Sequence, residues 1–300
     1  MRAVVLGAAA GGGFPQWNSN AEACRRARAH EPAVQARTQA SLAVSRDGER
    51  WFLLNASPDL RTQIERTPCL HPKTGLRSSP IAGVVLTGGD VDVIAGLLTL
   101  REREPFTLMA TERILSVLDA NPIFEVLARD VVTRETIALD QPIRLDEDMS
   151  VELFAVPGKV PLYLEDGSDQ PKIEINDTTV AAKVSDRDGT LFFIPGCAAM
   201  TPALAERLRG ADLVFFDGTL WRDDEMVRAG LGSKTGRRMG HMSVSGPEGT
   251  MAAFDKLGVR RKILIHINNS NPILADDSPE RAEVEAAGWE VSYDGMEITV

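Results

Sequence analysis

The sequence predicts one layered α/β domain that spans residues 1–300. Three observations support this prediction. Short runs of β-branched, leucine and aromatic residues recur along the chain, and stretches with apolar residues at helical spacing follow many of them. Polar turns come directly after several of the expected strands, where α/β folds collect their ligands. No low-complexity linker and no repeat of solenoid period divides the chain, so a single domain is the simplest interpretation.

The composition is that of a globular protein with a large core, and it disfavours two kinds of partner. Of the 300 residues, 43% are hydrophobic and 25% are charged, with a net charge of −10. Because an acidic surface repels phosphate backbones, we expect no nucleic-acid partner; the only short basic cluster is residues 234–238. The first apolar run is too short for a signal segment, and no later run reaches about 18 apolar residues, so no membrane association is expected.

The cysteines indicate a reducing compartment. Cys24, Cys69 and Cys197 are odd in number and widely spaced, and none belongs to a Cys-x-x-Cys pair. This usage provides no disulfide framework. We therefore expect a cytoplasmic protein. A homodimer is a further expectation, although no sequence feature fixes the oligomeric state.

The first elements are a strand, a glycine-rich loop and a helix. Residues 4–6 are expected to form a buried strand, and residues 20–30, rich in alanine and arginine, a helix. The loop at residues 7–15 lacks the Gly-x-Gly-x-x-Gly pattern before a clear helix, and it also lacks the lysine of a phosphate loop. Nucleotide binding is therefore not expected. The next two strands are expected at residues 41–45 and 51–55.

A second strand–helix unit contains the first candidate site. After residue 55 the sequence predicts a helix with Ser57 as its N-cap and Pro58 at its first position. Residues 81–86 form a buried strand, residues 87–92 a polar turn at its carboxyl end, and residues 93–101 a helix. The turn is a site candidate because ligands bind outside the carboxyl ends of such strands.

The remaining chain continues the alternation. Strands are expected at residues 107–110, 150–156, 178–184, 190–194, 213–216, 262–267 and 290–293. Helices are expected at residues 111–118, 202–208, 247–257 and 278–287.

Four histidines limit the search for chemistry. His30 lies in a polar helix and His71 in a proline-rich loop, so both are interpreted as surface residues. His241 follows a glycine in a loop, where packing gives little reason for an imidazole. His266 ends an apolar strand and precedes an amide-rich loop. The alternative for His266 is a core histidine with satisfied hydrogen bonds.

Three aspartates hold similar positions at strand ends. Asp90 and Asp92 lie in the turn after residue 86, and Asp217 follows the strand at residues 213–216. Each has a structural alternative, since Asp92 is also placed to cap the following helix and Asp217 to form a turn. The strand ends of one sheet edge converge, however, and carboxylates meeting imidazoles there suit a divalent transition metal.

The order of these motifs resembles the metallo-β-lactamase superfamily, which carries a His-x-His-x-Asp-His metal motif after a strand. The resemblance implies a four-layer αββα sandwich. Within that motif Gly88 replaces the first histidine, Asp90 the second and Val93 the last. Asp92 and the downstream Gly96 are retained.

Further along the chain the resemblance continues with more substitutions. Lys159 stands where the superfamily has the histidine of a Pro-Gly-His turn, and Cys197 stands where it has the bridging aspartate. His266 matches the final histidine. His241, followed by Met-Ser, is similar to the histidine loop of the tRNA-processing branch.

Within the superfamily, the chain is similar over nearly its whole length to the branch that works in pyrroloquinoline quinone (PQQ) biosynthesis. The segments that carry this similarity are residues 12–18, 55–61, 96–102, 216–221, 239–243 and 266–274. Many members of that branch have a Cys-x-Cys-x-x-Cys zinc knuckle near residues 19–24, where this chain has only Cys24. One thiolate cannot build a closed tetrahedral site, so we predict no structural zinc.

The remaining ligands favour one metal ion with open positions. A dinuclear hydrolytic site needs more ligands and a bridging carboxylate. We predict that Asp92, His241 and His266 hold Fe(II), which is close to the two-histidine, one-carboxylate set of non-haem oxygenases that use O₂. Asp217 is either a fourth ligand or a partner that orients a histidine, and Asp90 is a further metal candidate.

The resemblance implies an iron- and O₂-dependent hydroxylase that acts on the tyrosine ring of a small Glu-Tyr-derived substrate. Arg237 and Arg238 are candidates for binding the carboxylates of that substrate; the alternative is that both are solvated loop charges. Trp221 is a candidate for stacking on the phenol, with core packing as its alternative, and Asn269 completes the predicted substrate-binding set.

Two other functions stay open at this point. One is a metal-dependent hydrolase of a peptide or ester, which the origin of the fold suggests. The other is a non-catalytic carrier that binds the finished quinone. The lost histidines disfavour the hydrolase, and the retained His241 and His266 disfavour the carrier. The metal content separates the three: one iron for the oxygenase, two zinc ions for the hydrolase and no metal for the carrier.

Overall fold

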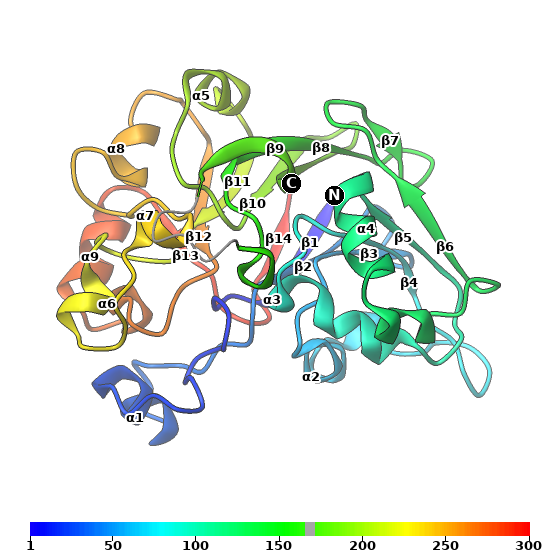
Figure 1. Ribbon diagram of the computed structural model, residues 1–300, viewed down its shortest axis with the longest axis horizontal. Helices are drawn as coiled ribbons and strands as arrows, with labels where there is room; N and C mark the ends of the chain where they lie inside the picture. The colour runs from blue at the N-terminus through cyan, green and yellow to red at the C-terminus, as the bar shows by residue number, and fades with distance from the viewer. Residues whose placement is uncertain (166–171) are drawn as a thin grey trace.

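A computed structural model describes residues 1–165 and 172–300. Two seven-stranded sheets pack face to face, and helices cover their outer faces (Figure 1). This is the αββα sandwich that the resemblance implied. Helices α5, α8 and α9 lie over one sheet and α2 and α4 over the other. The two termini meet, since the Met1 amino group donates to the Val300 carbonyl oxygen at 3.1 Å.

The first sheet has the order β14-β1-β2-β3-β4-β5-β6. The pairs β14/β1, β1/β2 and β2/β3 are antiparallel, and β3 to β6 run parallel. Its strands are β1 (Arg2–Gly7), β2 (Ser41–Ser45), β3 (Trp51–Leu54), β4 (Ile81–Val85), β5 (Phe106–Ala110), β6 (Val132–Thr136) and β14 (Glu297–Thr299).

The second sheet has the order β13-β12-β11-β10-β9-β8-β7. Strands β7 to β10 pair antiparallel, whereas β10 to β13 are parallel. Its strands are β7 (Ile143–Arg144), β8 (Ser150–Gly158), β9 (Glu174–Ser185), β10 (Thr190–Ile194), β11 (Leu213–Asp217), β12 (Arg261–Ile265) and β13 (Glu290–Val291).

The helices are short. The α-helices are α1 (Glu22–Arg28), α2 (Leu60–Arg66), α3 (Val91–Ile94), α4 (Glu112–Asp119), α5 (Pro202–Leu208), α6 (Glu225–Arg228), α7 (Gly236–Met239), α8 (Thr250–Phe254) and α9 (Pro279–Ala286). The 3₁₀ turns are η1 (Pro68–Leu70), η2 (Ala95–Leu100), η3 (Pro122–Val126), η4 (Leu162–Leu164) and η5 (Pro272–Leu274). None of the helices in the described residues is long and apolar enough to cross a bilayer.

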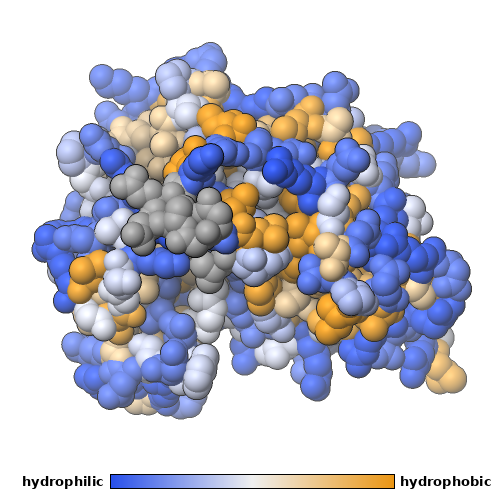
Figure 2. All heavy atoms as spheres, viewed as in Figure 1, coloured by the Kyte–Doolittle hydropathy of each residue, from blue (hydrophilic) through white to orange (hydrophobic). Residues whose placement is uncertain are grey.

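The core follows the two-residue alternation of the strands. In β10, Leu191 and Phe193 face the first sheet and join the cluster between the sheets, whereas Phe192 and Ile194 face the outer helices. A central strand of this kind is apolar on both sides, which explains why its sequence reads as a continuous apolar run. The face drawn in Figure 2 is mostly hydrophilic, with apolar residues interspersed, as expected for the surface over such a core.

Two expectations about elements were wrong, and three strands were not predicted. The helix after residue 55 begins at Leu60, with Asp59 at its N-cap position, and the buried Ser57 hydroxyl makes no capping bond. The helix expected at residues 93–101 is split into α3 and the 3₁₀ turn η2. Strands β6, β7 and β14 were missed because each lies at or next to a sheet edge, and their apolar pattern is weak.

Candidate metal centre

A cavity of about 470 Å³ lies at the carboxyl ends of parallel strands β4, β10, β11 and β12, where the two sheets meet. Its volume is within the roughly 300–1,000 Å³ of small-molecule sites. The loops after these strands supply most of its wall. The lining residues are Ala10, Gly11, Ala40, Asn55, Thr87, Gly88, Asp90, Asp92, Val93, Gly158, Lys159, Thr179, Val180, Pro195, Gly196, Thr219, Lys234, Met239, Gly240, His241, His266 and Asn268.

Asp217, the last residue of β11, is fully buried behind the cavity wall. One carboxylate oxygen accepts hydrogen bonds from the Thr219 amide at 3.0 Å and the Thr219 hydroxyl at 2.6 Å. The other accepts from the Cys197 amide at 2.8 Å and lies 2.7 Å from Nδ1 of His241. Because both oxygens are already engaged, Asp217 is better suited to orient His241 than to bind a metal ion.

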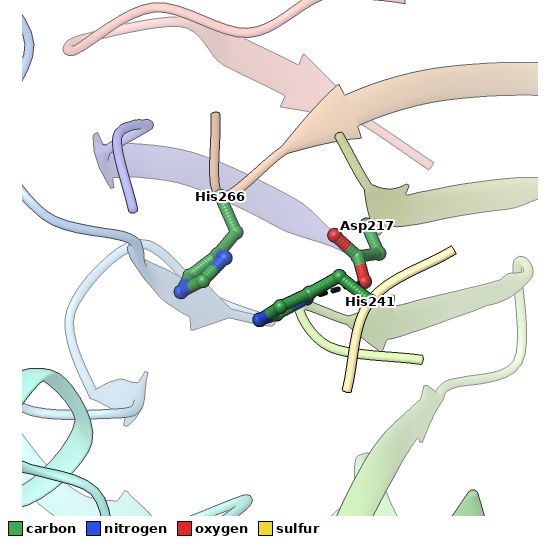
Figure 3. Close-up of side chains that lie close together, drawn as sticks. All are labelled: Asp217, His241 and His266. Atoms are coloured by element: carbon green, nitrogen blue, oxygen red, sulfur yellow. Dashed lines mark hydrogen bonds and ion pairs between the residues drawn. The ribbon is translucent and has the colours of Figure 1, made fainter. Parts of the chain in front are cut away.

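Thr219 connects this carboxylate to both histidines. Its hydroxyl oxygen lies 2.8 Å from Nδ1 of His266 and 3.1 Å from Nδ1 of His241. If the hydroxyl proton goes to Asp217, the hydroxyl oxygen accepts from the Nδ1–H of His266, and Asp217 accepts from the Nδ1–H of His241. This arrangement leaves the Nε2 lone pair of each imidazole available to the cavity. Figure 3 shows the outer nitrogen of each ring on the side away from Asp217.

The two imidazoles are stacked, with their centroids 5.2 Å apart and their planes 22° from parallel. His266 follows β12 directly and has a left-handed backbone, with φ 59°. That conformation is uncommon for a residue other than glycine and is frequent at functional sites. It places the ring beside that of His241, which lies in another loop. Segments that are distant in sequence therefore build one site.

Asp92 and His266 both line the cavity, and Oδ2 of Asp92 lies 3.1 Å from Nε2 of His266. Burial works against both charged forms. The hydrogen bond and opposite charge of each partner outweigh it, so the pKa of Asp92 is lowered and that of His266 is raised. With Nδ1 donating to Thr219, a neutral His266 sets a lone pair against a carboxylate oxygen. In that tautomer a cation between the two atoms, either a proton or a metal ion, removes the repulsion, whereas in the other tautomer the Nε2–H of His266 donates to Asp92.

The donor set fits a metal ion at this point. Ligand atoms of Asp217, His241 and His266 lie within 4.8 Å of one another, and within the described ranges no other group of histidine, cysteine and acidic residues meets this description. Both oxygens of Asp217 already accept hydrogen bonds, and Asp92, which lies outside that group, also lines the cavity beside His266. Asp90 also lines the cavity.

The four predicted substrate residues do not line this cavity. The guanidinium of Arg237 pairs with Glu248 at 2.8 Å and is largely exposed, and that of Arg238 pairs with Glu165 at 3.3 Å. Trp221 is buried in the core cluster beneath the outer helices, so its packing alternative describes it better. Nδ2 of Asn269, which is also buried, donates to Gln16 at 2.5 Å. His30 and His71 also lie outside the cavity lining.

Comparison with known proteins places this fold and site in a family. Residues 50–267 match the β-lactamase superfamily domain. Coenzyme PQQ synthesis protein B from Gluconacetobacter diazotrophicus is 65% identical over 302 aligned residues, which cover 99% of this chain and 98% of that protein. The chain belongs to the coenzyme PQQ synthesis protein B family.

Solved structures agree with this membership. The crystal structure of Zn²⁺-bound PqqB from Methylobacterium extorquens is 52% identical, has a TM-score of 0.98 and covers 100% of both chains. A diphosphatase from the PhnP family is 20% identical, with a TM-score of 0.71 and coverage of 99% and 97%, which shows likeness of fold alone.

The relative contains Zn²⁺, whereas we predicted no structural zinc for this chain. Here Cys24 is buried, and its sulfur lies 3.8 Å from Oδ1 of Asn269. The other cysteines, Cys69 and Cys197, are free thiols elsewhere in the fold. Cys24 therefore has no second thiolate beside it in the described chain, but the absence of a structural zinc stays a prediction.

Two positions where this chain differs from the superfamily motif, Cys197 and Lys159, have partners within the protein. The Cys197 thiol donates to the Ala199 carbonyl at 3.2 Å and does not line the cavity. Burial raises the pKa of Cys197 to about 12, so the thiolate that a metal needs is disfavoured. The Lys159 ammonium pairs with Glu165 at 2.9 Å.

The structure adds site residues that the sequence reasoning missed. Thr219 connects three of the predicted site residues, and its one available signal is its place two residues after Asp217 at a strand end. Lys234 lines the cavity, whereas the neighbouring Arg237 and Arg238 do not. No sequence pattern separates these three cations, because only the folded loop decides which of them faces inward.

Proposed function

We propose that this chain is an iron-dependent oxygenase that hydroxylates the tyrosine ring of a Glu-Tyr-derived intermediate in PQQ biosynthesis. Membership of the coenzyme PQQ synthesis protein B family supports the pathway. The observation that supports the chemistry is the short distance, 3.1 Å, between Nε2 of His266 and the Asp92 carboxylate. Both groups line the cavity, as does His241. We also propose a cytoplasmic location, which the three free cysteines favour.

In this proposal Asp92, His241 and His266 hold the metal ion. When bound, Fe(II) with open coordination positions supplies the activation of O₂. Asp217 and Thr219 keep the proton of each imidazole on Nδ1, so that both Nε2 atoms stay basic and fixed in direction. The cavity holds the phenol ring next to these atoms and limits the access of water.

The runner-up is a zinc hydrolase, which the Zn²⁺-bound relative favours. Paired-metal hydrolysis needs ligands that bridge two ions. At the positions concerned this chain has Gly88, the ion-paired Lys159 and the buried Cys197 thiol. The zinc of the relative is compatible with the oxygenase, since imidazole ligands accept both metals and sites of this type generally bind Zn²⁺ more tightly than Fe²⁺.

Metal reconstitution tests the proposal. The protein is freed of metal with a chelator and loaded under anaerobic conditions with Fe(II) or with Zn(II). Glutamyl-tyrosine, a two-electron reductant such as ascorbate and O₂ are then added, because hydroxylation places one oxygen atom on the ring and reduces the other to water. We expect about one iron per chain and a dipeptide that gains oxygen on its ring by mass spectrometry only in the iron-loaded sample. Cleaved dipeptide with two zinc ions per chain would support the hydrolase, and a protein that retains no metal would support the carrier.

Substitutions localise the activity. Asp92→Asn or His266→Ala should lower hydroxylation and iron affinity by at least about 100-fold, since each removes a proposed ligand. Asp130→Asn is the matched control, because its exposed carboxylate pairs with Arg103 on the surface. Full hydroxylation by the His266→Ala variant would contradict the site assignment.

A further inference from the structure

Lys234 differs from the other cations near the cavity. It lines the cavity and is half-buried, and it forms no ion pair within the part of the chain that the structure describes. An ammonium held in a partly dry pocket without a counter-charge is costly. On a chain with a net charge of −10, such a cation points to an anionic ligand.

The neighbouring cations each have a carboxylate partner within the protein, whereas none is seen for Lys234 in the described residues. The Lys159 ammonium lies 2.9 Å from a carboxylate oxygen of Glu165, and the same carboxylate pairs with Arg238 at 3.3 Å. Arg237 is occupied by Glu248 on the outer surface. Lys159 and Lys234 are the two basic side chains that line the cavity, and among the described residues only Lys159 has a carboxylate partner.

The backbone beside Lys234 is fixed to the metal centre. The Gly236 amide donates to the Asp223 carbonyl at 2.8 Å, and the Arg237 amide donates to the Asp223 carboxylate at 2.7 Å. The His241 amide then donates to the Gly236 carbonyl at 2.9 Å. The cation and a proposed metal ligand therefore belong to one short, internally bonded segment, which sets their separation.

We propose that Lys234 binds a carboxylate of the substrate and so sets which end of the molecule meets the metal. This inference rests on the proposed function and names the residue that gives it specificity. Lys234 attracts a carboxylate to its own side of the cavity. An acidic substrate therefore binds with its carboxylate at Lys234 and its uncharged phenol ring toward Asp92, His241 and His266.

Binding measurements under anaerobic conditions test this role without turnover. Iron-loaded wild type, Lys234→Gln, Lys234→Arg and Lys256→Gln are titrated with glutamyl-tyrosine by calorimetry. They are also titrated with two analogues, one amidated at the glutamyl side chain and one at the C-terminus. Lys256 is the matched control, because it is an exposed lysine outside the cavity lining. Melting curves check that every variant is folded.

We expect Lys234→Gln to bind glutamyl-tyrosine about tenfold more weakly, which corresponds to about 1.4 kcal/mol. Lys234→Arg should stay close to wild type because it keeps the charge, and Lys256→Gln should be unchanged. One of the two amidated analogues should bind wild type about tenfold more weakly than glutamyl-tyrosine does. Lys234→Gln should bind that analogue and glutamyl-tyrosine equally, which identifies the carboxylate that Lys234 binds.

The outcomes separate this inference from the proposed function. Equal affinity of Lys234→Gln and wild type, or equal losses in Lys234→Gln and Lys256→Gln, would overturn the role of Lys234 alone. Normal binding and a normal Lys234 effect without hydroxylation in O₂ would overturn the oxygenase alone. Wild type that binds no dipeptide would contradict both.

Discussion

The hydroxyl of Thr219 has more influence on the site than its size suggests. It lies within hydrogen-bonding distance of the Asp217 carboxylate and of the Nδ1 atoms of His241 and His266. One buried carboxylate and one hydroxyl thus contact the Nδ1 atoms of two imidazoles. Partners of this kind around metal-binding histidines commonly account for 10–100-fold in metal affinity.

Thr219→Val tests this network, because valine keeps the shape of threonine and removes only the hydroxyl. We expect iron affinity to fall about 10–100-fold, since His266 loses the acceptor that holds its proton on Nδ1. Thr219→Ser keeps the hydroxyl and should stay within a few-fold of wild type. Anaerobic competition with a chelator measures both. Equal affinity of the valine and serine variants would show that the hydroxyl does not orient the rings.

At the scale of single residues, the sequence predicted several side chains that line the cavity, but it did not predict the direction of the loop arginines. Asp92, His241 and His266 were selected because each follows a strand or glycine signal, and such ends converge in an α/β fold. Arg237 and Arg238 were chosen because a guanidinium can bind a carboxylate through two hydrogen bonds. Charge is visible in a sequence, whereas the direction of a side chain on a loop depends on partners such as Glu165 and Glu248, which are distant along the chain.

At the scale of elements, buried strands were predictable and short helices were not. Strands β2 and β10 have the bounds that their apolar patterns predicted, because tertiary contacts and sequence preference agree there. The prediction of one continuous helix after Asp90 was wrong because a tertiary contact overrides the helical spacing of its apolar residues. The amide of Gly96 donates to the Ala56 carbonyl at 2.8 Å, so the chain turns into η2 instead of continuing α3.

Gly96 makes that contact possible, and its substitution provides an element-scale prediction. A Cβ atom at this position would lie 2.0 Å from the Ser57 carbonyl oxygen and 2.7 Å from that of Ala56. Gly96→Ala must push η2 away from the loop before α2, at a cost of about 1–3 kcal/mol in the free energy of unfolding. Urea denaturation measures this cost. Gly232→Ala is the control, since its Cβ would meet only the flexible Met226 methyl group. Equal stability of the two variants would contradict the close approach.

At the scale of the whole molecule, the chain must pass from one sheet to the other to close the sandwich. It enters the second sheet between β6 and β7 and returns to the first between β13 and β14. Asp294 lies on this crossover and accepts hydrogen bonds from the Ala8 amide at 3.2 Å and from the Thr38 amide and hydroxyl, both at 2.8 Å. This carboxyl group therefore connects the C-terminal crossover to the loops that follow β1 and precede β2.

Burial raises the pKa of Asp294 to about 6, against the opposing effect of the hydrogen bonds from Thr38. In the unfolded chain the group titrates near pH 4. Between these values the folded protein holds a proton that the unfolded chain releases, so this group's stabilising contribution is lost as pH rises from about 4 to 6. Asp294→Asn does not titrate. We therefore expect the difference in unfolding free energy, wild type minus Asp294→Asn, to fall by about 2 kcal/mol across that window after allowance for partial solvent contact. Urea denaturation at a series of pH values measures it, with Asp130→Asn as the exposed control. A difference that is constant or rises with pH would mean that the crossover carboxylate is ionised in the folded protein throughout.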